Sequence, residues 1–210
     1  MTTREKIVRK DDKRKIIGNG AARVFAKKGF DKTTTRDIAK AAKISAASVY
    51  YYFDSKEDLL YQILDETIST GLALIGKIEK SDRDLKHKLA EILLLHTGAA
   101  VDYNKMKLLV HEAKSLYPRH RKAISKKQSD YVKHLTRILD TLKRNGEIVD
   151  LDTTVCAFAF FGMVSWAYRW YNPKGKIKPT ELARTFRQIF TEGIFRASAF
   201  SSNRLEELKD

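Results

Sequence analysis

The chain has 210 residues and a mass of 24.1 kDa, with 43% hydrophobic residues and a mean hydropathy of -0.42. This length and balance predict a globular protein with a substantial core and exclude wholesale disorder. The formal net charge of +15 favours partners that carry phosphates, either nucleic acid or an acidic membrane surface. The excess is concentrated near the N-terminus, where residues 1–56 hold about 15 basic residues against about 6 acidic ones.

Features of the termini and the single cysteine indicate the compartment. With one cysteine, Cys156, an intramolecular disulfide is excluded, and a buried structural thiol in a reducing cytoplasm is expected. The N-terminal stretch MTTREKIVRKDDKRK is charged throughout, unlike a signal peptide. The most apolar stretch, TTVCAFAFFGMVSW, is too short to cross a bilayer. We therefore expect a cytoplasmic protein that does not span a membrane.

Apolar residues recur at spacings of three and four along the chain, which predicts an all-α fold. The first helix is expected near residues 12–28, with an apolar face and a stop at Gly29. Thr34 and Asp37 have the spacing of a capping box for a short helix, and Ser45 can cap a second one that ends at Phe53. Two short capped helices joined by a tight turn predict a helix-turn-helix.

A long helix is expected to begin at a second capping pair, Ser55 with Asp58, and to link two domains. Further helical segments are predicted near residues 84–102, 104–115, 120–145, 152–171 and 179–200.

The second helix of the predicted motif has the composition of a recognition helix. Its first turn holds only small residues, Ser45, Ala46, Ala47 and Ser48, which let a backbone approach the floor of the major groove. Taken alone, these four residues could simply be a cap followed by good helix formers. The following tyrosines add to the pattern, because Tyr52 falls beside the core residues while Tyr50 and Tyr51 point away, where their hydroxyls can bond phosphates.

Residues 12–64, including TTTRDIAKAAKISAASVYYYFDSKEDLL, resemble the DNA-binding domain of the TetR family of transcriptional regulators. The resemblance implies DNA contacts from Thr35, Arg36, residues 45–48, Tyr50, Tyr51 and Lys56. It also implies two domains, a helix-turn-helix domain at 1–56 and a helical ligand-binding and dimerisation domain at 57–210. Family members often carry glycine where this chain has Lys43, and lysine then glycine where it has Ala46 and Ala47. The base preference therefore does not transfer from relatives.

The resemblance further implies a homodimer on a palindromic operator, with the last two long helices of each subunit forming a four-helix bundle. The stripe of Ala157, Phe161, Val164 and Tyr168 fits this role, as does a second stripe formed by Leu182, Phe186, Ile189, Phe190 and Gly193. Core packing within a single chain is the alternative reading of both stripes.

The phrase MVSWAYRWYNPKGKIKPTELA is similar to the corresponding phrase in TetR-family repressors that respond to acyl-coenzyme A thioesters. In that reading, Trp166 or Trp170 stacks on adenine or walls an acyl tunnel, and Arg169 and Lys174 meet the coenzyme phosphates. The alternative is an aromatic cluster at the dimer interface with Arg169 in a salt bridge. A different hydrophobic effector is also open.

No nucleophile with a base, paired carboxylates, metal-ligand cluster or phosphate loop stands out, so we expect neither an enzyme nor a metal or cofactor site. The five histidines are scattered, and His111 lacks the partner histidine of a zinc motif. The competing class is a basic amphipathic protein of membrane surfaces. We predict instead a DNA-binding repressor that a small molecule releases from its operator, and the resemblance implies that this molecule is an acyl-coenzyme A.

Overall fold

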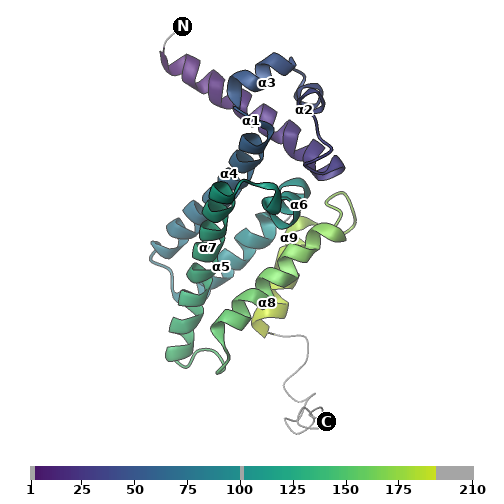
Figure 1. Cartoon of the computed structure of the whole chain (residues 1–210). Coiled ribbons are helices and arrows are strands. Elements are labelled where there is room, and N and C mark those ends of the chain that lie inside the picture. The colour runs from purple at the N-terminus through teal and green to yellow at the C-terminus, as the bar shows by residue number, and fades with distance from the viewer. Residues whose placement is uncertain (1–2, 100–101, 193–210) are drawn as a thin grey trace.

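The computed structural model describes residues 3–99 and 102–192, and within those ranges every regular element is a helix (Figure 1). The all-α prediction is confirmed. The elements are α1 Thr3–Lys28, α2 Thr35–Ala42, α3 Ala46–Tyr52, α4 Lys56–Glu79, α5 Leu85–Ala99, α6 Tyr103–His111, η1 Ala113–Ser115, α7 Pro118–Arg144, α8 Thr153–Trp166, η2 Ala167–Arg169 and α9 Pro179–Glu192.

Several helix bounds differ from the predicted ones. The first helix begins nine residues before the expected start at residue 12, and the predicted segment 104–115 divides into α6 and the 3-10 turn η1. The predicted segment 152–171 likewise ends in a 3-10 turn, η2. The last predicted helix is described as far as Glu192, so the part of that prediction beyond Glu192, with Gly193, lies outside the described residues.

Local hydrogen bonds at the helix starts follow the predicted caps. The Thr34 hydroxyl accepts a bond from the amide of Asp37, and the Asp37 carboxylate accepts the Thr34 amide at 3.0 Å, which completes the capping box of α2. The Ser45 hydroxyl accepts the Ser48 amide at 3.1 Å and so caps α3. At α4, Ser55 caps the helix in the same way, but the Asp58 carboxylate receives the amide of Asp54 instead of that of Ser55.

The turn between α2 and α3 requires an unusual backbone conformation. Lys43 has φ 57° and ψ 46°, which is the left-handed region that glycine adopts at little cost and lysine does not. Its amide donates to the carbonyls at the end of α2 and thereby stops that helix. Close packing of α2 on α1 also depends on a small residue, because a Cβ at Gly20 would lie only 3.2 Å from the Ala42 amide.

We call α1 to α3 the head; its core is formed by apolar faces that meet around α4. Val49 and Phe53 of the helix-turn-helix are buried with Ile38, Ala39 and Ala42 against residues of α1 and α4. The same cluster continues through Leu108, Leu116 and Ile124. The head therefore shares its core with the first part of the C-terminal body, and residue 56 does not separate two independent cores.

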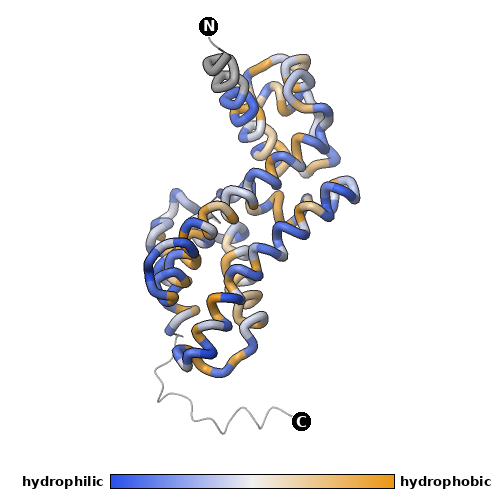
Figure 2. Tube along the Cα trace, turned by 90° about the vertical axis from the view of Figure 1, so that its left-hand side faces the viewer, coloured by the Kyte–Doolittle hydropathy of each residue, from blue (hydrophilic) through white to orange (hydrophobic). Residues whose placement is uncertain are grey.

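The C-terminal body, formed by α5 to α9 and the second half of α4, has its own core (Figure 2). Ala157 and Val164 of α8 and Tyr168 of η2 are buried in it, and Phe161 packs against it, so the first predicted dimer stripe packs within the single chain. Leu182 and Phe186 of α9 are buried in the same core. The alternative reading of these stripes is therefore the correct one for their buried members. The reason is that α8 and α9 pack on α5 and α7 of their own chain.

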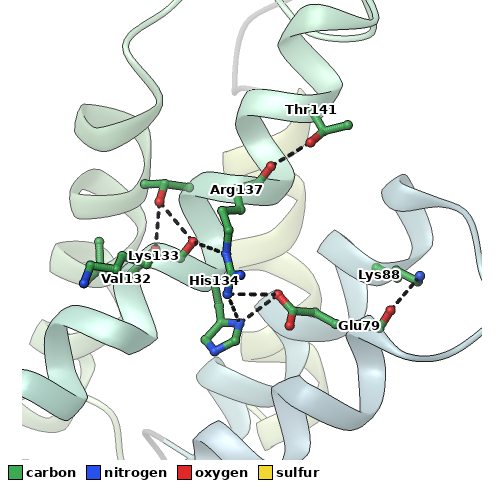
Figure 3. A network of polar contacts seen from close by, with 8 residues as sticks. Glu79, Lys88, Val132, Lys133, His134, Arg137 and Thr141 are labelled. Carbon is green, nitrogen blue, oxygen red and sulfur yellow. Dashed lines mark hydrogen bonds and ion pairs between the residues drawn. The ribbon is translucent and has the colours of Figure 1, made fainter.

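Polar contacts join the far ends of α4, α5 and α7 (Figure 3). The Glu79 carboxylate lies 2.7 Å from Nδ1 of His134 and 3.8 Å from the guanidinium of Arg137. The backbone carbonyl of Glu79 accepts the Lys88 ammonium at 2.9 Å. One residue at the end of α4 thus holds both neighbouring helices, and this end of the body is fixed by charge-assisted bonds.

Across residues 3–99 and 102–192, every helix is too short or too polar to traverse a bilayer.

Candidate nucleic-acid interface and effector region

The tyrosines of α3 divide between core and surface as the helical spacing predicts. Tyr50 is 61% exposed and Tyr51 73% exposed, whereas Tyr52 is half-buried against the core of the head. The Tyr51 and Tyr52 rings meet edge to face with centroids 5.0 Å apart. The helix therefore presents two phenols outward on rigid rings, with their apolar neighbours anchoring it from behind.

A hydrogen bond joins the two exposed helix faces of the motif. The hydroxyls of Thr35, at the start of α2, and Tyr50 lie 3.1 Å apart. Next to Thr35, Arg36 is exposed and has neither a hydrogen bond nor an ion pair within the described part of the chain. A charged, unengaged guanidinium beside two hydroxyls is a suitable surface for phosphate oxygens.

The four small residues at the start of α3 do not all face outward. Ser45 and Ala47 are exposed, and the hydroxyls of Ser45 and Ser48 lie 2.8 Å apart. Ala46 is half-buried and packs against the core of the head, so its methyl group supports the helix from within. The surface available to a base edge is thus formed by Ser45, Ala47 and Ser48.

Lys56 lies differently from what its predicted phosphate contact requires. Its ammonium donates to the backbone carbonyls of Phe30 at 2.8 Å and Thr33 at 3.0 Å, with Asp31 at 3.4 Å, and lies 4.3 Å from the centre of the Phe30 ring. All three of its protons therefore have partners in the connection between α1 and α2. The side chain thus closes that connection, which local spacing could not predict because the partners lie 23 to 26 residues away.

The electrostatics of the motif favour an anionic partner. Asp37 is the single acidic residue of α2, and α3 has none. The Lys28 ammonium lies 2.6 Å from the Asp37 carboxylate and, together with the Thr34 bonds, holds the pKa of Asp37 well below its usual range. This negative charge is compensated in place, which leaves the exposed lysines and arginines of the head to set its potential.

The residues predicted to bind an effector lie at the surface around the end of α8. Trp166 is 58% exposed and Trp170 51% exposed, and Lys174 and Arg169 are exposed as well. The Arg169 guanidinium stacks over the Trp166 ring at 4.6 Å, and Trp170 lies edge to face with Phe186 at 6.3 Å. In the described ranges Arg169 has no ion pair, so the salt bridge of the alternative reading is not formed there.

Behind this surface, side chains connect the end of α8 with the head. The Tyr168 hydroxyl hydrogen-bonds Nε2 of His111 on α6. Four residues earlier on α6, the Lys107 ammonium donates to the carbonyl of Ala26 at 2.6 Å, in the last turn of α1. A displacement of Tyr168 can therefore reach α1 through a single short helix.

A second connection lies at the start of α4. The carboxylate of Glu57, which is buried, accepts the Tyr117 amide at 2.8 Å and lies 3.0 Å from Nδ1 of His120 on α7. The His120 ring stacks on Tyr61 of α4 at 4.0 Å. Adjacent residues of α4 thus hold different partners, because Lys56 bonds the head and Glu57 bonds the body.

Comparison with known families decides the class of this chain. Residues 17–63 match the model for bacterial regulatory proteins of the tetR family, and residues 82–194 match that for the tetracyclin repressor-like C-terminal domain. The chain belongs to the tetR family. Its α2 and α3 are accordingly the helix-turn-helix of a DNA-binding transcriptional regulator.

This tetR-family regulator is similar along most of its length to several individual regulators. The chain is 29% identical over 184 residues to the HTH-type transcriptional repressor KstR2 of Rhodococcus jostii RHA1, covering 83% of this chain and 87% of the relative. It is 25% identical over 181 residues to the fatty acid metabolism regulator protein of Bacillus subtilis 168, covering 85% and 93%. The fold is similar, with a TM-score of 0.75 and 23% identity over 84% and 97% of the two chains, to AibR in complex with isovaleryl coenzyme A and operator DNA.

One feature of this tetR-family body has no counterpart in the sequence predictions. His96 of α5 is grouped with Tyr131 of α7 and with Phe160 and Phe161 of α8, at ring distances between 4.8 and 5.6 Å. The other three residues lie 35 or more positions from His96 in the chain, so spacing could not predict that they contact it. Among the described residues, no three histidine, cysteine or acidic side chains are grouped as they would be around a metal ion.

Proposed function

We propose that this regulator is a repressor that binds a palindromic operator as a homodimer and is released from it by an acyl-coenzyme A. The observation that carries the proposal is the exposed face of α2 and α3, where Arg36, Ser45, Tyr50 and Tyr51 surround the small first turn of α3. In the proposed complex, Ser45, Ala47 and Ser48 meet base edges in the major groove. Thr35, Arg36, Tyr50 and Tyr51 bond phosphates on either side of it.

An unburied apolar face supports the homodimer. On α8, Val155 is 66% exposed and Phe158 59%, and both lie on the side opposite to the buried stripe, where Gly162 also lies. Ile189 on α9 is 39% exposed. A Cβ at Gly162 would meet nothing within 4 Å, so a partner helix has room to approach there. We assign this face, together with Ile189 of the second predicted stripe, to the interface between subunits in place of the stripe predicted on α8.

Two relatives support the class of effector through their names, one a fatty acid metabolism regulator and the other a structure with isovaleryl coenzyme A. Trp166 and Trp170 offer planar rings, and Arg169 and Lys174 offer cations, for the adenine and phosphates of the coenzyme. The effector acts by favouring a dimer in which the two heads no longer match successive major grooves, about 34–36 Å apart. The bonds from Tyr168 through His111 and Lys107 to Ala26 give it a route to the head.

The same proposal makes this protein a cytoplasmic regulator without catalytic activity, with its DNA-binding part at 1–56 and its effector and dimer part at 57–210. The other classes of function make different predictions. A repressor of a different hydrophobic effector would release DNA with that compound and ignore the thioesters. A membrane-surface protein would bind anionic vesicles and show no preference among DNA sequences.

The test starts with an operator selected from a random duplex pool and measures its affinity by fluorescence anisotropy. Isovaleryl-coenzyme A, octanoyl-coenzyme A and free coenzyme A are then titrated into the complex. The proposal expects at least one thioester to weaken operator binding by about tenfold or more, and free coenzyme A to have much less effect. Unchanged affinity at saturating concentrations of both thioesters would refute the acyl-coenzyme A part while leaving DNA binding intact.

A further inference from the structure

The aromatic cluster around His96 contains a polar atom without a partner. Nδ1 of His96 lies 3.2 Å from the Tyr131 hydroxyl, but Nε2 is shielded from solvent and, within the described residues, has no hydrogen-bond partner. It is the one buried side-chain nitrogen or oxygen in those residues with this deficit. Buried polar groups are nearly always paired, so this nitrogen calls for an explanation.

The protonation states around His96 follow from burial. Burial lowers the pKa of His96 to about 4 and raises the pKa of Tyr131 to about 12. At neutral pH the imidazole is therefore uncharged and the phenol keeps its proton.

The tautomer follows from counting unpaired groups. If Tyr131 donates to Nδ1 of His96, the proton of the imidazole is on Nε2 and one N–H remains unpaired. If instead Nδ1 donates to the Tyr131 oxygen, both the phenolic proton and the Nε2 lone pair remain unpaired. The first arrangement leaves fewer buried polar groups without partners, so Nε2 carries the hydrogen and is a donor.

The surroundings of this donor restrict what it can bind. Phe160 is fully buried beside the imidazole, and the Phe161 ring meets it edge to face at 4.8 Å. The neighbouring Thr97 hydroxyl already donates to the Leu93 carbonyl at 2.8 Å. No cation contacts the His96 ring within the described residues, so an anionic group would be left uncompensated. An alcohol would bring a hydroxyl proton without an acceptor, whereas a carbonyl oxygen brings an acceptor alone.

We infer that Nε2 of His96 donates a hydrogen bond to a carbonyl oxygen of the effector, whose apolar body lies among Tyr131, Phe160 and Phe161. This inference rests on the proposed function, since it places the carbonyl of the same effector. The carbonyl could belong to a thioester or to a ketone on an apolar skeleton, because the donor recognises the same oxygen in both. Phe161 is half-buried at the margin of the cluster, and its ring lies edge to face with both His96 and Tyr131.

The position of Tyr131 gives the inferred site a connection to the head. A Cβ built at Gly71 of α4 would lie 2.8 Å from the Tyr131 ring, so the ring is packed directly on the backbone of α4. The same helix carries Lys56 at its start, which bonds the head. A ligand that moves Tyr131 therefore pushes on the helix that holds the head.

The test compares probes that differ only at the carbonyl. Octanoyl-coenzyme A is compared with S-octyl-coenzyme A, and 2-decanone with decane, by binding calorimetry on the full chain. We expect the wild type to prefer at least one carbonyl probe by about tenfold or more, and His96→Phe, which keeps a planar ring but lacks the donor, to lose the preference. A preference confined to the first pair identifies a thioester, and one confined to the second pair identifies a ketone.

Three results would overturn the inference. The first is equal binding of both members of each pair by the wild type, and the second is a preference that persists in His96→Phe. The third is a wild-type imidazole that carries its hydrogen on Nδ1 and not on Nε2, because Nε2 is then an acceptor and cannot donate to a carbonyl oxygen. If His96→Phe does not fold, nitrogen-15 NMR of the wild-type imidazole decides, since the inference requires the hydrogen on Nε2.

The outcomes also separate this inference from the proposed function. If a thioester releases the operator but binds no better than its thioether, the inferred carbonyl site fails and the proposed function stands. If a carbonyl probe is preferred through His96 yet the operator complex is unaffected, the proposed release fails and the site stands. A second variant, Tyr131→Phe, should weaken the preference without abolishing it, because the tautomer of His96 is then no longer fixed by a donor.

Discussion

Tyr50 and Tyr51 are exposed on the surface of α3, and their hydroxyls are the parts of these residues that the proposed DNA complex uses. We expect Tyr51→Phe to weaken binding to operator and to random duplex alike, by about three- to tenfold, because a lost phosphate bond carries no sequence information. Tyr50→Phe should behave similarly and also remove the bond to Thr35. Anisotropy with both duplexes measures the effect, and Tyr52→Phe is the matched control. A change confined to the operator would indicate base contact instead.

His96 makes the free energy of unfolding depend on pH. Because its pKa is about 4 in the folded protein and about 6.5 when unfolded, the unfolded chain binds more protons between these values. Stability from this residue is complete above pH 6.5 and is lost as the pH falls towards 4. We expect a loss of about 2 kcal/mol between pH 7.5 and 5.0 by urea unfolding, relative to His96→Phe, which lacks the titrating group. Parallel curves for the two proteins would contradict this.

At the scale of single residues, the sequence allowed correct predictions where the deciding neighbours are close in the chain. Tyr50, Tyr51 and Tyr52 divide between surface and core because helical rotation alone separates them. His96 could not be assigned in this way, since its surroundings come from Tyr131 and Phe161 on other helices.

In the turn of the helix-turn-helix, Lys43 has a backbone conformation that is unfavourable for any residue other than glycine. Since Lys43 occupies the left-handed region at φ 57°, Lys43→Gly should stabilise the protein by up to about 1 kcal/mol, after the greater entropy of the unfolded glycine is subtracted. Lys40→Gly, which removes the same charge from the interior of α2, should destabilise by about 1 kcal/mol. Urea unfolding of both variants measures this. Destabilisation by Lys43→Gly would show that the lysine side chain itself stabilises the turn.

Two cations of the motif are expected to behave oppositely. Lys56→Met keeps the aliphatic stem but removes the donor to three carbonyls, so it should lower the melting temperature and leave the salt dependence of DNA binding nearly unchanged. Arg36→Gln should leave the melting temperature unchanged and reduce the slope of log affinity against log salt by about 1. Thermal melts and anisotropy at several salt concentrations separate the two. A reduced slope of log affinity against log salt in Lys56→Met would instead support the phosphate contact predicted for Lys56.

The starts of the short helices could be predicted from their capping residues, but the face of α8 that is buried in the body could not. The starts of α2, α3 and α4 follow from Thr34, Ser45 and Ser55 because a cap bonds within its own first turn. In contrast, α8 is apolar on all sides, so periodicity alone could not separate its core stripe from its exposed one. The stripe predicted for the dimer is consequently the one packed in the chain's own core.

The proposed dimer gives a prediction for the whole molecule. Phe158→Glu places a charge in the middle of the exposed face of α8, so we expect a monomer in analytical ultracentrifugation at micromolar concentration. Operator affinity should fall by about a hundredfold or more because the two heads are no longer linked. The control is Val149→Glu, at a residue 70% exposed in the connection between α7 and α8. A dimeric Phe158→Glu protein would contradict the assignment of this face.

The order of the helices in the whole molecule could be predicted from the sequence, but the contacts between the head and the body could not. A basic N-terminal region with two short capped helices predicted the helix-turn-helix, and the family resemblance implied the helical part that follows it. The contacts that join the two parts, Lys107 with Ala26 and Glu57 with His120, span 81 and 63 residues and have no local signature. In the mechanism that we propose, these are the contacts through which the effector acts on the head.

The proposed repressor function depends on recognition of base pairs in duplex DNA by the outer face of α3. The most direct measurement selects a preferred duplex for the wild type and for Ala47→Lys from the same random pool. We predict that the wild type selects a palindrome, which it binds about 10³-fold or more above random duplex, and that the variant selects a changed base at one symmetric pair of positions. Identical selected sequences for both proteins, or no preference over random duplex, would contradict it.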